Sequence, residues 1–117
     1  MQIVNDCLIF NLNEDLDDDN VRQIQKEIIE KVKGASTKGV IIDVSAVRVI
    51  NVFTFSILRD TARMIYMLGA KVVFVGFKAG VASALVDLDI EFGDILTSVT
   101  MEDGFELLQS NVNISNE

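Results

Sequence analysis

The sequence predicts a single α/β domain built around a mixed, mostly parallel β-sheet, with an N-terminal hairpin and about four helices. One observation is that continuous apolar runs typical of buried strands, at Gly39–Val44 and Ala70–Gly76, alternate with segments of helical apolar spacing. Another is that two short strand-like segments precede the first helix. Strands that alternate with helices pair in parallel through right-handed crossovers. A chain of 117 residues is long enough to bury one core of its own.

The chain is predicted to begin with a β-hairpin. Its strands are Gln2–Asn5 and Cys7–Leu12, and a tight turn near Asn5 and Asp6 joins them. Because side chains alternate along a strand, Leu8 and Phe10 should lie on the same face.

An acidic stretch, residues 13–20, leads into a predicted helix that ends near Lys33 and is closed by Gly34. Acidic residues at the start and lysines at the end suit the helix dipole. The apolar positions that should face the core are Val21, Ile24, Ile28 and Val32. Acidic residues also alternate in calcium loops, as they do here at Asp15, Asp17 and Asp19. The mid-loop Gly and the distal Glu of such loops are missing, so a solvated helix start is favoured and no metal is predicted.

Residues 39–69 join a buried strand to a helix through a short polar turn. Gly39–Val44 is a continuous apolar run that carries Asp43 at its carboxyl end, as expected for an interior parallel strand. Asn51 is the predicted N-cap of a helix over Val52–Leu68, which stops at the next glycine. The apolar stripe predicted for this helix is Phe53, Ile57, Met64, Ile65 and Leu68. Unpaired helix N–H groups point outward at such a turn, so function is predicted there.

The remainder of the chain continues the alternation. The predicted elements are, in order, a strand at Ala70–Gly76, a short helix at Val81–Leu88, a strand at Ile95–Val99 and a terminal helix at Glu102–Gln109. Phe105 and Leu108 of the terminal helix should face inward. Residues 1–110 are therefore predicted to form one domain, and residues 111–117 a flexible polar tail.

Charge and cysteine content restrict the partners and the compartment. A formal net charge of −8 argues against nucleic acid or an anionic membrane as the main partner and favours a basic or neutral protein. The lone cysteine, Cys7, cannot form an intramolecular disulfide and is interpreted as a small core residue in a reducing compartment. No apolar run approaches the ~18 residues that would span a membrane, so a cytoplasmic protein is expected.

The sequence offers little for catalysis. It contains no His, which removes the usual general base, and Cys7 lies in a presumed strand without a partner that could activate it. Residues 76–80 lack the Gly-Lys-Ser/Thr ending of a phosphate-binding loop, and no dinucleotide fingerprint is present. We therefore expect neither an enzyme nor a bound cofactor.

Three segments in the right order resemble the STAS domain of anti-sigma factor antagonists. They are V-I-I-D-V-S-A-V-R-V-I-N at Val40–Asn51, M-L-G-A-K-V-V-F-V-G at Met67–Gly76 and V-A-S-A-L at Val81–Leu85. The opening D-C-L-I-F-N-L-N-E-D-L-D-D at Asp6–Asp18 is most similar to the RsbS-type subunit of the stressosome. The resemblance covers residues 2–109.

This resemblance implies a non-catalytic protein that binds a switch kinase or anti-sigma factor and co-assembles, as a homo- or hetero-oligomer, with other STAS proteins in a large shell. In the family, a Ser at the start of the central helix is phosphorylated by the kinase, which releases the kinase. A phosphate there adds about −1.5 to −2 charge beside helix N–H groups. The residues carried over as partner-binding are Asp43, Asn51, Val52, Phe53 and Ser56.

The sequence departs from the family pattern at the phosphorylated position. The family's Asp-Ser pair falls on Asn51 and Val52, and Val52 has no hydroxyl group. A second family Thr falls on Ala84. The nearest hydroxyls belong to Ser56, on the same helix face as Val52, and Thr54, which should point away. Both are candidate relocated acceptors, and both are more simply helix-surface or packing residues.

Other functions remain open at this point. Some STAS domains are thought to bind nucleotides or lipids beside the same turn, so a small-ligand module is one alternative. An accessory STAS subunit of a transport complex is another.

Overall fold

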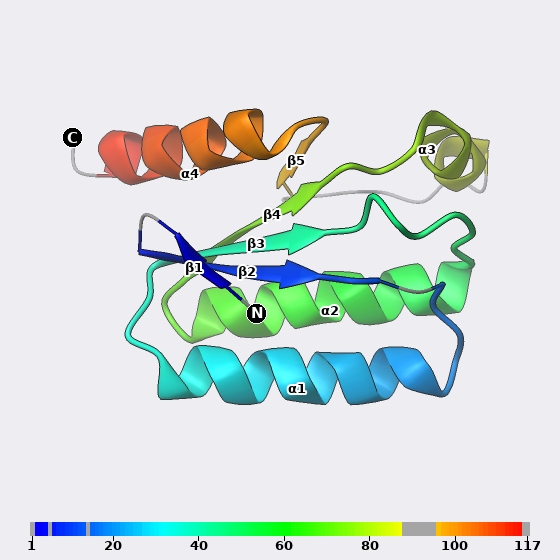
Figure 1. Cartoon of the computed structure of the whole chain (residues 1–117), viewed down its shortest axis with the longest axis horizontal. Helices are drawn as coiled ribbons and strands as arrows, with labels where there is room; N and C mark the ends of the chain where they lie inside the picture. The colour runs from blue at the N-terminus through cyan, green and yellow to red at the C-terminus, as the bar shows by residue number, and fades with distance from the viewer. Residues whose placement is uncertain (1, 5, 14, 88–95, 116–117) are drawn as a thin grey trace.

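The computed structural model describes residues 2–4, 6–13, 15–87 and 96–115. They form five strands and four helices (Figure 1). The elements are β1 (Gln2–Val4), β2 (Cys7–Asn11), α1 (Asn20–Gly34), β3 (Gly39–Asp43), α2 (Val52–Met67), β4 (Lys71–Val75), α3 (Ala79–Asp87), β5 (Leu96–Ser98) and α4 (Met101–Ser115).

The sheet is mixed and mostly parallel, as the sequence predicts. Its strand order is β1-β2-β3-β4-β5, with β1 antiparallel to β2 and the other neighbours parallel. Helices α1 and α2 cover one face and α4 covers the other (Figure 1). Because β1 pairs with β2 in antiparallel register, the predicted hairpin is confirmed, and Asp6 between the two strands has a φ of 65°.

Side chains alternate along the strands into two cores. The core toward α1 and α2 takes Leu8, Phe10, Val40, Ile42, Val72 and Phe74. The core toward α4 takes Ile9, Ile41, Val73, Val75 and Leu108. Because β3 and β4 contribute side chains to both cores, both of their faces are covered, which explains their continuous apolar sequences.

Cys7 is half-buried beside the core toward α4. Burial, with the nearby charge of Asp6, raises the pKa of its thiol.

The predicted stripe of α2 is partly wrong. Ile57 and Ile65 are buried, but Met64 and Leu68 are exposed, and the inward positions include Phe55, Leu58 and Ala62. The helix carries apolar residues on more than one face, so its sequence allows several stripes. Packing against α1 and β4 decides which one is buried. The predicted end at Gly69 is confirmed, since this residue has a φ of 96° that favours glycine.

Other boundaries also differ from the prediction. The terminal helix continues past Gln109 to Ser115, so the predicted tail of residues 111–117 begins inside α4, and its flexibility stays a prediction. Helix α1 has no acidic residue in its first turn, because the acidic stretch ends before the helix begins. Leu88 and Ile95, which were predicted to bound a helix and a strand, lie outside the described residues.

Candidate functional site

The candidate site lies where the parallel strands end, at the right of Figure 1. Backbone hydrogen bonds continue past the strands and hold the loops together. The N–H of Leu12 donates to the carbonyl of Asp43 at 3.0 Å, and the N–H of Val44 donates to that of Val75 at 2.8 Å. The loops after β2, β3 and β4 therefore form one surface at the carboxyl edge of the sheet.

Asp43 shapes the turn that follows β3. Its Oδ1 accepts a hydrogen bond from the N–H of Ser45 at 2.9 Å. Ser45 in turn lies against Gly76, which follows β4 with a φ of 87°. A Cβ atom at Gly76 would lie only 2.8 Å from the Cβ of Ser45, so both backbone conformation and space require glycine there. Asp43 is thus at the predicted place, and in the structure it supports the loop.

Asn51 caps α2 as predicted. Its Oδ1 accepts from the N–H of Thr54 at 2.8 Å, and the hydroxyl of Thr54 accepts from the N–H of Asn51 at 3.1 Å. This reciprocal pair is a capping box in which Thr takes the position usually held by Glu or Gln. The box fixes the direction in which the chain enters the helix.

Replacing Asn51 with Ala is expected to lower the free energy of unfolding by about 1 kcal/mol, because the N–H of Thr54 loses its acceptor. Thermal or urea unfolding followed by circular dichroism measures the change. Asn51→Asp is the matched control, since Asp caps as well as Asn. Equal losses for the two variants would show that the cap contributes nothing.

Asp15 connects the loop before α1 to the loop after β3 through hydrogen bonds. Its Oδ1 accepts from the backbone N–H of Arg48 at 2.8 Å, and its Oδ2 accepts from the guanidinium of Arg48 at 3.0 Å. These hydrogen bonds, from the backbone first and the side chain second, hold the pKa of the Asp15 carboxyl below its ordinary value. The pair positions the segment that leads to Asn51.

The bonds between Asp15 and Arg48 are expected to be pH-dependent. A carboxyl whose pKa is lowered by folding stabilises the fold above its unfolded pKa of about 3.9, and this contribution is lost as the pH falls through the lower folded value. The amide resonance of Arg48 should therefore shift with a midpoint below about 3.9. Asp15→Asn should abolish the shift. A midpoint at or above that value in the native chain would contradict the geometry.

Apolar side chains are exposed on the segment that leads from Arg48 into the start of α2. Val49 is 68% exposed and Val52, the first residue of α2, is 50% exposed. Phe53 is half-buried, and the guanidinium of Arg22 on α1 lies 5.2 Å from its ring centroid. Apolar side chains that are exposed close together are one mark of a surface that binds another protein.

The two candidate hydroxyls differ in access. Thr54 is fully buried, and besides its bond to the Asn51 N–H its hydroxyl donates to the carbonyl of Asn51 at 3.1 Å. Ser56 is half-buried, and its hydroxyl donates to the carbonyl of Phe53 at 2.7 Å. Thr54 points inward, as expected from its helix position. Ala84 lies in α3, and its side chain is outside the described ones.

The structure brings Asp43, Asn51 and Val52 to one edge of the sheet, with Phe53 and Ser56 in the first turns of α2. Sequence reasoning missed the role of Asp15, which it placed in a solvated helix start. It also missed Val49 and the contact of Arg22 with Phe53. The pairing of Asp15 with Arg48 could have been suspected from the sequence, because loops that follow neighbouring parallel strands lie side by side. The sequence does not show which of the several acidic residues in that loop pairs with Arg48.

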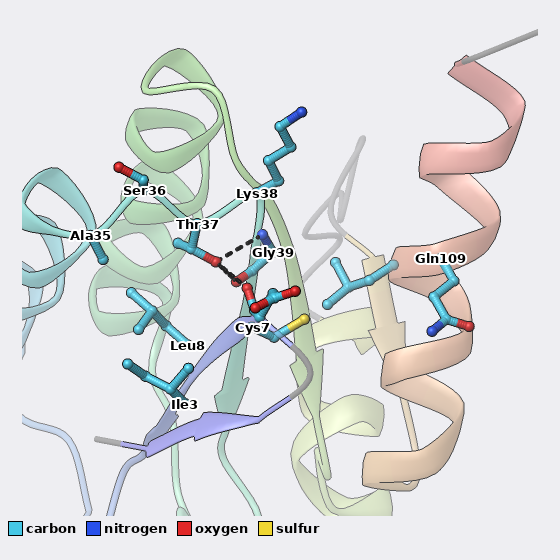
Figure 2. Close-up of a pocket in the computed structure, with 11 residues that line it drawn as sticks. Ile3, Cys7, Leu8, Ala35, Ser36, Thr37, Lys38, Gly39 and Gln109 are labelled. Atoms are coloured by element: carbon cyan, nitrogen blue, oxygen red, sulfur yellow. Dashed lines mark hydrogen bonds between the residues drawn. The ribbon is translucent and has the colours of Figure 1, made fainter.

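A roomy pocket lies at the opposite, amino end of the strands (Figure 2). It measures about 740 Å³, and its walls come from the β1–β2 hairpin, the α1–β3 loop and α4. Thr37 stands at its rim, where its hydroxyl donates to the carbonyl of Asp6 and accepts from the N–H of Gly39. This pocket is separate from residues 44–52, which join β3 to the start of α2 and which we call the Asn51 turn. The alternative nucleotide or lipid site was expected beside that turn.

Among the residues that the structure describes, no group of three or more acidic, His or Cys side chains is arranged to hold a metal ion. None of the helices that the structure describes has the length and apolar character needed to cross a membrane.

Comparisons with known proteins agree with one another. A family model described as the STAS domain matches residues 1–103. The chain is 21% identical over 91 residues to the RsbT co-antagonist protein RsbRA of Bacillus subtilis, a match that spans 78% of this chain and 33% of that protein. The chain therefore spans about a third of the length of this relative.

Solved structures are similar over nearly the whole chain. The RsbS protein of Moorella thermoacetica superposes with a TM-score of 0.80 at 26% identity, over 96% of this chain and 95% of that chain. A structure described as the molecular architecture of the stressosome, a signal integration and transduction hub, gives a TM-score of 0.79 at 27% identity, over 95% of this chain and 96% of that chain.

Proposed function

The chain belongs to the STAS domain family, whose model matches residues 1–103, and on this premise we propose that it is a non-catalytic antagonist and scaffold subunit of a stress-signalling assembly. It binds a switch kinase or anti-sigma factor and joins other STAS proteins in a large complex. The similarity to RsbS and to the stressosome structure supports this proposal. The absence of His from the sequence supports a binding role over catalysis.

The binding surface in this proposal is the Asn51 turn. The observation that carries it is the exposure of Val52 at the first position of a capped helix, beside the exposed Val49. The capping box and the bonds between Asp15 and Arg48 hold these side chains before a partner arrives. A surface that is already ordered loses little conformational entropy on binding, which favours affinity.

Regulation in this proposal differs from the family pattern. Val52 carries no hydroxyl at the usual phosphorylated position, so the chain holds its partner whether or not ATP is present. Of the two nearby hydroxyls, Ser56 needs less rearrangement to reach a kinase than the buried Thr54. Calorimetric titration of the purified chain with the switch kinase of its own organism, with and without magnesium and ATP, tests the proposal.

A further inference from the structure

The pocket at the amino end of the strands has the size and the walls of a small-molecule site. Its volume of about 740 Å³ falls within the range of about 300 to 1,000 Å³ that is typical of such sites. Its apolar surface comes from residues that include Ile3, Cys7 and Leu108. Its polar groups include those of Asp6 and Gln109. Mainly apolar walls with a few polar groups are the usual composition of a ligand site. We call this cavity the amino-end pocket.

Close contacts hold the walls of the amino-end pocket in place. The hydroxyl of Thr37, in the α1–β3 loop, donates to the carbonyl of Asp6 at 2.6 Å and accepts from the N–H of Gly39 at 3.3 Å. A Cβ atom at Gly39 would lie only 2.9 Å from the Sγ of Cys7 and 3.2 Å from a methyl carbon of Leu108. The hairpin, the loop and α4 therefore meet tightly beside the cavity. A pocket that is already ordered loses little conformational entropy when a ligand binds.

Asp6 places a negative charge at the amino-end pocket. It lines the cavity, and its charge contributes to the raised pKa of the Cys7 thiol, so the two side chains lie close together. The φ of 65° at Asp6 is a backbone conformation that favours glycine and that Asp and Asn tolerate better than other residues. Because the backbone there favours a residue without a side chain, the presence of a carboxylate points to a use for it.

Among the described residues, Lys38 is the other charged one that lines the amino-end pocket. Figure 2 shows its side chain extending away from Cys7. Lys38 and Asp6 are both exposed, so water and salt screen the effect of each on a ligand. Asp6 is the one whose charge acts on the apolar wall at Cys7, and the formal net charge of −8 adds an attraction for cations. The charge in and around the pocket therefore favours a positively charged ligand.

We propose that the amino-end pocket binds a small amphipathic cation, which is a molecule with an apolar body and a primary ammonium group. The apolar body lies against Cys7 and Leu108, and the ammonium group lies beside the carboxylate of Asp6. The phosphates of a nucleotide or the carboxylate of a fatty acid would be repelled by the same negative charge. This inference does not rest on the proposed function, because the pocket is at the other end of the strands from the Asn51 turn.

Three indole compounds test the charge of the ligand on the native chain. Tryptamine, tryptophan and 3-indolepropionate carry the same ring on the same short chain, but their charges are positive, zwitterionic and negative. Because the sequence contains no Trp, the indole fluorescence comes from the probe alone. Tryptamine should bind with a dissociation constant of about 1 mM, as expected for a ligand of its size. Indolepropionate should bind about fivefold more weakly or worse, with tryptophan between the two.

Asp6→Asn tests which residue attracts the cation. It removes the charge and keeps a side chain that tolerates a positive φ, so the fold should persist, which circular dichroism verifies. Tryptamine should then bind about fivefold more weakly, and its advantage over indolepropionate should disappear. Asp18→Asn is the matched control, because it makes the same change in net charge at an exposed position in the loop before α1. It should leave the affinity unchanged, and equal losses in both variants would overturn the proposal.

Cys7 reports where the cation binds, since it is the only cysteine of the sequence and it lines the pocket. Tryptamine should slow the reaction of its thiol with iodoacetamide in proportion to the bound fraction. Tryptamine binding without this protection would place the ligand elsewhere and overturn the proposal. So would the absence of tryptamine binding at about 10 mM, well above the expected dissociation constant. Tighter binding of indolepropionate or tryptophan than of tryptamine would also contradict it, because Lys38 would then decide the ligand.

Discussion

Val52→Asp is expected to weaken binding of the switch kinase or anti-sigma factor by about 30-fold or more. The change places a charge at the centre of the proposed surface, where partner binding removes it from water, and truncating a central contact of an interface costs about 2 kcal/mol or more. The fold should be unaffected, because Val52 is half exposed and a carboxylate near a helix N-terminus is favourable. Calorimetry measures the affinity, and thermal unfolding verifies the fold.

Ile3→Asp is the control for this change. Ile3 is an exposed aliphatic residue on the edge strand β1, away from the Asn51 turn, so its replacement should leave partner affinity within about twofold of the native value. Equal affinities of the Val52→Asp variant and the native chain would refute the assignment of the binding surface. Equal losses in both variants would mean that added negative charge, rather than its position, weakens binding.

Val52→Ser is expected to convert the chain into a substrate of the switch kinase. The change removes the two methyl groups of an exposed side chain at the first position of α2 and supplies one hydroxyl, where helix N–H groups favour a phosphate. Incubation with the kinase, magnesium and ATP should then add one phosphate, seen by intact mass. The phosphate carries about −1.5 to −2 charge and should release the kinase.

Val52→Ala is the matched control, since it shortens the side chain without supplying a hydroxyl. Neither this variant nor the native chain should gain a phosphate. A Val52→Ser chain that binds the kinase but stays unmodified would show that the turn is not presented to the kinase active site. A phosphate on Ser56 of the native chain would show that the acceptor has moved along the helix.

Much of the fold could be predicted because the local signals were consistent. The runs Gly39–Asp43 and Lys71–Val75 are apolar at nearly every position, which is typical of short strands covered on both faces. Asn51 precedes an apolar helix pattern, and the structure has it as the N-cap. The strand end at Asp43 and this cap together predict where the turn lies.

The errors share a physical cause, which is tertiary packing that the sequence does not specify locally. Helix α2 has enough apolar residues for two stripes, and the buried one excludes Met64 and Leu68. The hydrogen bonds between Asp15 and Arg48 join residues 33 positions apart. Nothing in the acidic loop distinguishes Asp15 from its neighbours until the loop after β3 is placed beside it.

The measurement that tests the central claim most directly is the calorimetric affinity of the purified native chain for the switch kinase of its own organism, with and without magnesium and ATP. We expect the same affinity under both conditions and no change in the mass of the chain, because Val52 offers no acceptor at the contact. Binding that is lost with ATP, together with a phosphate on this chain, would contradict a constitutive antagonist. No binding under either condition would contradict the Asn51 turn as a kinase-binding surface.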